Sequence, residues 1–222
     1  MKVLKFGGSC LKEGESMLEV GEIITSDPSP KAVVVSAVNN VTDSLVAFMS
    51  ELRTEQEVQE FIRELRDTHM ALLRDVAKDM ETKQMAVSML LERLTRLERL
   101  LYGICYLEEL TPRTRDLVQS FGEQMSVILV SAMLQDMGVN AVPLMADEIG
   151  IITDGNYGSA TADLAATREN IGSRIREMVG RAEVPVITGF FGRTEEGHIT
   201  IFGRNGTDYS AAVIGNAIQA DS

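Results

Sequence analysis

The chain has 222 residues, of which 45% are hydrophobic, and this composition predicts one globular domain with a buried core rather than a disordered segment. Its 21 lysines and arginines are outnumbered by 33 aspartates and glutamates, with no basic cluster, so nucleic acid and anionic membranes are poor partners. Cys10 and Cys105 make neither a CxxC pair nor a disulfide framework, which favours a reducing compartment. With no signal peptide and no apolar run near the ~20 residues that span a bilayer, we expect a soluble cytoplasmic protein.

A metal site built from histidines is not expected. The two histidines, His69 and His198, lie far apart in the sequence, and both are interpreted as structural or surface residues. We therefore predict no metal held by the protein's own side chains.

The first predicted element is a short apolar strand over residues 3–6, which stops at Gly7 and Gly8 before a helix that Ser9 can start. A strand, a glycine turn and a helix in this order let backbone amides approach an anion, and Lys5 adds positive charge. The alternative is an ordinary turn with a solvent-facing lysine, because the pattern is neither GxxxxGK[ST] nor GxGxxG.

A continuous apolar run over residues 32–37 predicts a strand covered on both faces, as in parallel α/β sheets. It ends in small polar residues before helical spacing resumes near Leu45. Ser36 and Thr42 therefore fall at the same carboxyl edge as the first glycine turn, where such sheets bind ligands. Turn formation and helix capping are the alternative roles for both.

Residues 51–110 are rich in Leu, Met, Glu and Arg, with apolar positions at three- and four-residue steps. This pattern predicts two or three amphipathic helices that project from the sheet, used for packing or self-association. Another helix opens at Pro112, and Gly122-Glu123 interrupts its apolar stripe. Glu123 is either an edge residue or a ligand-binding carboxylate.

Strands are predicted over residues 139–144, 149–153, 184–188 and 198–202, with a helix over 162–181. The glycine loop at residues 203–209 then leads from the last strand into a small-residue helix, an arrangement that suits an anion. Strands that alternate with helices predict an α/β fold, in which a mostly parallel sheet lies between two helical layers.

Six segments, taken together, resemble the aspartate kinase family of the amino-acid kinase fold, over essentially the whole chain. They are KFGGSC at 5–10, VSAVNNVT at 35–42, LTPRTRD with FGE at 110–123, IITD at 151–154, GFFG at 189–192 and GRNGTDYSA at 203–211. The family's versions read KFGGTS, VSAMxxVT, LTPRSRD with FGE, ITD, GFIG and GRGGSDYSA.

The resemblance implies a role for each matching residue. Lys5 and Asp208 would be catalytic, Lys5 neutralising the transferring phosphoryl group and Asp208 ordering Lys5. Glu123 would meet the substrate's ammonium and Arg204 a carboxylate, which a guanidinium binds through two parallel hydrogen bonds. The implied substrate-binding residues are Ser36, Thr42, Glu123, Phe190 and Arg204. The implied phosphate-binding residues are Gly7, Gly8, Ser9, Gly206 and Thr207.

The implied reaction is phosphorylation of the β-carboxylate of L-aspartate by ATP, the first step toward lysine, threonine and methionine. Mg²⁺ would be held mainly through the nucleotide, and a homodimer or higher homo-oligomer is expected. Two alternatives stay open: a kinase for glutamate or N-acetylglutamate, and a catalytically inactive amino-acid-binding fragment or module.

The sequence departs from the family pattern at Cys10, Asn205 and Thr207. Thr207 keeps a hydroxyl, and Asn205 tolerates a left-handed backbone better than other non-glycine residues. The family continues beyond the point where this chain stops, at Ser222. We therefore expect residues 1–222 to form one catalytic domain with the amino-acid half of the site, without most of the nucleotide half and without a regulatory domain.

Overall fold

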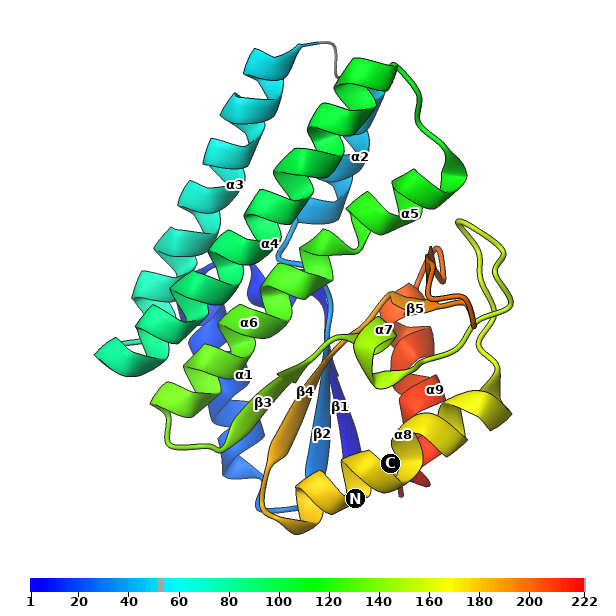
Figure 1. The fold of residues 1–222 in the computed structure, drawn as a ribbon. Coiled ribbons are helices and arrows are strands. Elements are labelled where there is room, and N and C mark those ends of the chain that lie inside the picture. The colour runs from blue at the N-terminus through cyan, green and yellow to red at the C-terminus, as the bar shows by residue number, and fades with distance from the viewer. Residues whose placement is uncertain (52–53, 222) are drawn as a thin grey trace.

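A four-stranded parallel sheet lies at the centre of the structure, a computed structural model that describes residues 1–51 and 54–221 (Figure 1). The strand order is β1-β2-β4-β3, and each neighbouring pair is parallel. The predicted parallel α/β sheet is confirmed. Its strands are β1 (Lys2–Phe6), β2 (Lys31–Val35), β3 (Ala141–Leu144) and β4 (Val184–Thr188).

Helices cover both faces of the sheet, because successive side chains of the buried strand β2 point to opposite faces. Val33 and Val35 pack into one apolar core with helices α1 (Gly14–Ser26) and α6 (Phe121–Asp136). Ala32 and Val34 pack into a second core with α8 (Leu164–Gly180) and α9 (Gly206–Ile218). This gives the predicted three-layer arrangement (Figure 1).

Helices α5 (Pro112–Gln119) and α6 follow one another closely. Thr111 caps the start of α5 by accepting a hydrogen bond from the Thr114 amide at 3.1 Å. The segment Pro112–Asp136 is long and apolar enough to cross a membrane by length and composition, but 94% of its most apolar window is buried inside the protein. That burial is typical of a core helix.

The predicted helical excursion over 51–110 is a long hairpin that projects from the sheet (Figure 1). Residues 52–53 of that range, and Ser222 at the chain end, lie outside the described residues. Inside the hairpin, His69 is fully buried, and its Nδ1 lies 2.7 Å from the Leu65 carbonyl oxygen. The hairpin comprises α3 (Glu55–Val76) and α4 (Met80–Leu107), and α2 (Val41–Glu51) precedes it.

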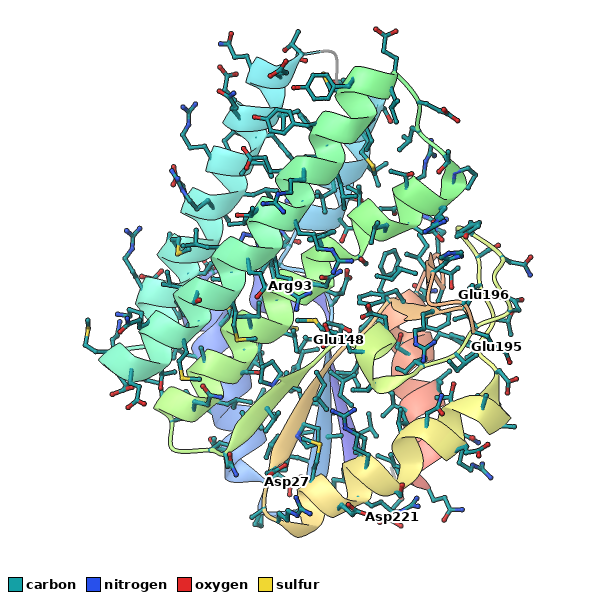
Figure 2. All side chains as sticks on the ribbon, in the orientation of Figure 1. Asp27, Arg93, Glu148, Glu195, Glu196 and Asp221 are labelled. Atoms are coloured by element: carbon teal, nitrogen blue, oxygen red, sulfur yellow. The ribbon has the colours of Figure 1, made fainter. Side chains whose placement is uncertain are left out.

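The hairpin is joined to the sheet layer by Arg93 on α4. Its Nη2 lies 3.4 Å from Glu148 Oε1, a pair labelled in Figure 2, and its Nη1 donates to Gln124 Oε1 at 3.4 Å. Glu148 belongs to the short helix α7 (Ala146–Ile149).

The predicted strand over residues 149–153 is wrong. Helix α7 occupies its start, with its first amide bonded to Thr188 Oγ1 at 2.8 Å. Gly150 then ends the helix with a left-handed φ of 93°. The β-branched residues that follow make only the isolated bridges Ile152 to Arg193 and Thr153 to Ala162.

The glycine-flanked segment at 189–192 contributes to a strand that the sequence did not indicate. Strand β5 (Phe191–Arg193) pairs antiparallel with β6 (Ile199–Ile201) in a two-stranded sheet. Figure 2 labels Glu195 and Glu196 in the turn between them, at the rim of the molecule. Ser9 does not start the first long helix either: it lies in the short 3₁₀ helix η1 (Gly8–Leu11), and α1 begins at Gly14.

Candidate active site

A cavity of about 320 Å³ opens at the carboxyl edge of the sheet, where the ends of β1, β2 and β4 meet the start of α9. All of the predicted site residues except Ser9 line it, together with Gly203 and Asn205. Ser9 lines a second cavity of about 250 Å³, whose walls share Gly8, Ser36 and Thr42 with the first. The fold therefore gathers residues from both ends of the chain at one edge.

Lys5 and Asp208 form an ion pair across this cavity. Lys5 leaves the end of β1, and its Nζ lies 2.9 Å from Asp208 Oδ1 in the first turn of α9. Lys5 is 29% exposed and Asp208 is 62% exposed, so the pair faces solvent and contributes little to folding. Asp208 instead restricts where the flexible lysine places its charge.

Glu123 has the most strongly shifted pKa among the residues that line the cavity. Its side chain is 2% exposed, and Oε1 accepts a hydrogen bond from the Ala37 amide at 3.0 Å. Oε2 is buried and has no hydrogen-bond partner among the described residues. Burial raises the pKa of Glu123 to about 8, against the opposing effect of the Ala37 amide. A buried carboxylate oxygen without a partner is suited to a cationic ligand.

Gly122 lets helix α6 approach β2 closely enough for that contact. A Cβ at this position would lie 2.7 Å from the Ala37 Cβ and 3.2 Å from Thr42 Oγ1. Any side chain here would push the helix away from β2 and carry Glu123 with it. The glycine that interrupts the apolar stripe is therefore a packing requirement of the site.

The loop that leads into α9 supplies positive charge and unpaired amides. Asn205 takes a left-handed φ of 58°, as its residue type allows, and begins the helix without a side-chain cap. Helices α3, α4, α5 and α8 all begin with a side-chain cap. The Gly206 amide donates to the Gly203 carbonyl at 3.0 Å, so it is the next two amides of α9, those of Thr207 and Asp208, that are available to an anion. Arg204 lines the cavity and is exposed.

Two further contacts fix the cavity walls. Thr207 Oγ1 donates to Ser36 Oγ at 3.2 Å, which joins the α9 turn to the end of β2. Phe190 has a φ of 74°, uncommon for a bulky residue, and its carbonyl accepts from the Phe202 amide at 2.8 Å. This backbone conformation holds Phe190 against the loop.

Sequence reasoning missed three contributors to this site. Gly203 and Asn205 were noted as loop residues but not as lining, and the Ala37 amide that binds Glu123 carries no signature because any residue has an amide. Asp116, buried on α5 outside this cavity, was named only within the LTPRTRD segment.

No group of three or more His, Cys, Asp or Glu side chains could hold a metal ion within residues 1–51 and 54–221. Mg²⁺ carried mainly by nucleotide phosphates remains the prediction for this site.

With this geometry established, comparison with known proteins defines the class. The model of the Amino acid kinase family matches residues 1–222, and the chain belongs to that family. Within it, the chain is a homologue of aspartokinases. Aspartokinase 1, chloroplastic, of Arabidopsis thaliana is 34% identical over 224 residues, which are 97% of this chain and 38% of that protein. Aspartokinase 3 of Bacillus subtilis is 30% identical over 229 residues, which are 100% of this chain and 47% of that protein.

Solved structures agree with this assignment. Aspartokinase III of E. coli in complex with lysine and aspartate superposes with a TM-score of 0.87 at 26% identity, over 99% of this chain and 47% of that one. The same enzyme in complex with aspartate and ADP gives a TM-score of 0.86, also at 26% identity and with the same coverage of both chains. The chain thus spans less than half the length of these relatives.

Proposed function

We propose that this chain is the amino-acid-binding part of an aspartate kinase, which phosphorylates the β-carboxylate of L-aspartate to give 4-phospho-L-aspartate. The observation that carries the proposal is the buried Glu123 carboxylate with its unpartnered Oε2, in the same cavity as Arg204 and the Lys5–Asp208 pair. A free amino acid such as aspartate offers an ammonium to the Glu123 carboxylate and carboxylates to the cations Arg204 and Lys5. The E. coli relative that binds aspartate supports this choice of substrate.

Each side chain has a separate task in the proposed reaction. Glu123 binds the ammonium, and Arg204 holds a carboxylate in a two-point hydrogen bond. The reacting β-carboxylate is already a nucleophile at neutral pH, so no general base is needed. Asp208 acts as an organiser of Lys5 rather than as a proton acceptor.

Charge neutralisation supplies the rest of the catalysis. ATP with its Mg²⁺ would provide the phosphoryl group and part of the positive charge. Lys5 and the amides of Thr207 and Asp208 in the first turn of α9 would stabilise negative charge that develops between donor and acceptor. The uncapped start of α9 and the lysine beside it fit a phosphate chemically. The E. coli relative in complex with aspartate and ADP supports nucleotide use.

Two measurements test the proposal. Incubation of the chain with ATP, Mg²⁺ and L-aspartate should yield an acyl phosphate that hydroxylamine traps as a hydroxamate, and Lys5→Ala should lower the rate of this yield by about 10²- to 10³-fold. Nucleotide binding, measured separately, distinguishes the alternatives: L-aspartate binding without ATP binding would indicate an amino-acid-binding module.

The choice of amino acid is tested by competition. Glutamate or N-acetylglutamate as the preferred acceptor would contradict the proposal. Glu123 makes the second of these unfavourable, since an acylated amine brings no cation to its buried oxygen. We also propose that the chain serves the biosynthesis of lysine, threonine and methionine, lies in the cytoplasm and forms homo-oligomers.

A further inference from the structure

Asp116 is a buried carboxylate outside the cavity that nothing in the proposed reaction uses. It lies on α5 with 1% of its surface exposed. One of its oxygens, Oδ2, accepts two backbone hydrogen bonds, from the Gly158 amide at 2.9 Å and from the Ile201 amide at 3.0 Å. Asp116 therefore ties its helix to two segments that are distant in sequence.

The segment that contains Ile201 runs directly into the loop at residues 203–205, which carries Arg204. Ile201 ends β6, and Arg204 follows three residues later. The Ile201 carbonyl also accepts a hydrogen bond from the Ala160 amide at 2.9 Å. Because Arg204 is only three residues from Ile201, the hydrogen bond between Asp116 and the Ile201 amide limits the positions that Arg204 can take.

The segment that contains Gly158 packs against the same loop. Gly203 has a left-handed φ of 76°, and a Cβ on it would lie 3.0 Å from the Gly158 carbonyl oxygen. The residue whose amide binds Asp116 thus lies next to Gly203, with its carbonyl oxygen on the side where a side chain of residue 203 would stand. Asp116 therefore holds the loop at residues 203–205 in two ways. It bonds the Ile201 amide, just before the loop, and the Gly158 amide, in the segment that packs against the loop.

Asp116 also has a fixed relation to Glu123. The two residues are seven positions apart within the helical segment Pro112–Asp136, which places them on one side of the helix and about 10 Å apart along it. The helical segment Pro112–Asp136, which carries Glu123, is therefore bonded through Asp116 to the segment that leads to Arg204 and to the segment that packs against it.

We propose that Asp116 is a positioning residue that sets the separation of Glu123 and Arg204, so that both ends of one amino acid are bound at the same time. This inference rests on the proposed function for the roles of the two binding residues. Its structural part, that Asp116 holds the loop at residues 203–205, is independent of any ligand.

The chain contains a matched control for this arrangement. Asp136, at the far end of the same helical segment, accepts two amide hydrogen bonds through Oδ1, from Lys78 at 2.7 Å and from Asp79 at 2.6 Å. These amides belong to the turn between α3 and α4. Asp136→Ala thus removes the same kind and number of hydrogen bonds away from the cavity.

The test compares Asp116→Ala, Asp116→Asn and Asp136→Ala in the 222-residue chain. The amide hydrogen exchange of residues 203–205 is measured without ligand. The dissociation constant of L-aspartate is measured by calorimetry. We expect Asp116→Ala to speed loop exchange and to weaken L-aspartate binding by about 10- to 100-fold, the scale of a 1 Å misplacement. Asp136→Ala should change neither. Asp116→Asn keeps an oxygen acceptor but loses the charge, so its effects should lie between wild type and alanine.

The proposal would be overturned if Asp116→Ala left the amide hydrogen exchange of residues 203–205 unchanged. It would also be overturned if Asp136→Ala changed this exchange and the L-aspartate affinity as much as Asp116→Ala does. If the alanine variant does not fold, the asparagine variant decides alone, and wild-type exchange together with wild-type affinity would refute it. A wild-type chain that binds no L-aspartate refutes the proposed function instead, while loop exchange still decides whether Asp116 holds the loop.

Discussion

Replacement of Glu123 by glutamine should change how the stability of the protein depends on pH. Burial raises the pKa of Glu123 from its ordinary 4.5 to about 8 in the folded chain. Between these values the folded state keeps a proton that the unfolded state has lost. The contribution of Glu123 to the free energy of unfolding of the wild type therefore falls as the pH rises from about 4.5 to about 8.

The size of this effect follows from the two pKa values. At about 1.4 kcal/mol for each pKa unit, the Glu123 contribution lost between pH 4.5 and pH 8 is about 5 kcal/mol. Glutamine keeps an oxygen to accept from the Ala37 amide and places an uncharged group where Oε2 is buried. Glu123→Gln therefore lacks this pH dependence.

Chemical denaturation of both chains at half-unit steps from pH 5 to pH 9 measures the difference. The stability of Glu123→Gln relative to wild type should rise steadily up to about pH 8 and then level off. Other titrating groups are common to both chains and cancel in the comparison. A stability difference that stays constant across this range would refute the assignment of Glu123 as a buried, protonated carboxyl.

Four further variants test the rest of the site. Lys5→Ala should lower turnover by about 10²- to 10³-fold with L-aspartate affinity little changed; Asp208→Asn should also lower turnover, and near-normal turnover in that variant would contradict the organising role. Arg204→Lys should raise the KM for L-aspartate by about tenfold or more, because lysine cannot make the two-point bond, and an unchanged KM would exclude that bond. Gly122→Ala should lower the free energy of unfolding by about 1–3 kcal/mol through its contact with Ala37, and an unshifted thermal melt would show that the helix can yield.

The central sheet and the site were predictable from sequence for the same reason. Uninterrupted apolar runs such as residues 32–37 signal strands covered on both faces, and polar residues just beyond them must then meet at the carboxyl edge. Lys5 and Asp208 are about 200 residues apart, yet Lys5 lies near the carboxyl end of β1 and Asp208 in the first turn of α9, so the parallel topology brings them together.

Other features depended on contacts that no local pattern reveals. Residues 149–153 have strong strand propensity, but the Thr188 hydroxyl holds the start of α7 and Gly150 turns the chain, so tertiary contacts outweigh propensity. The raised pKa of Glu123 required knowledge of its burial. The role we assign to Asp116 arises from amides 42 and 85 residues away along the chain.

Proton release on ligand binding tests the central claim most directly. An ammonium beside Glu123 favours the ionised carboxylate, so L-aspartate that binds at pH 7 must displace the proton that burial keeps there. Calorimetric titration in two buffers of different ionisation enthalpy should show release of about one proton by the wild type and none by Glu123→Gln. N-acetyl-L-aspartate should bind far more weakly and release none. L-aspartate binding without proton release, or equal affinity for the acetylated ligand, would contradict the account.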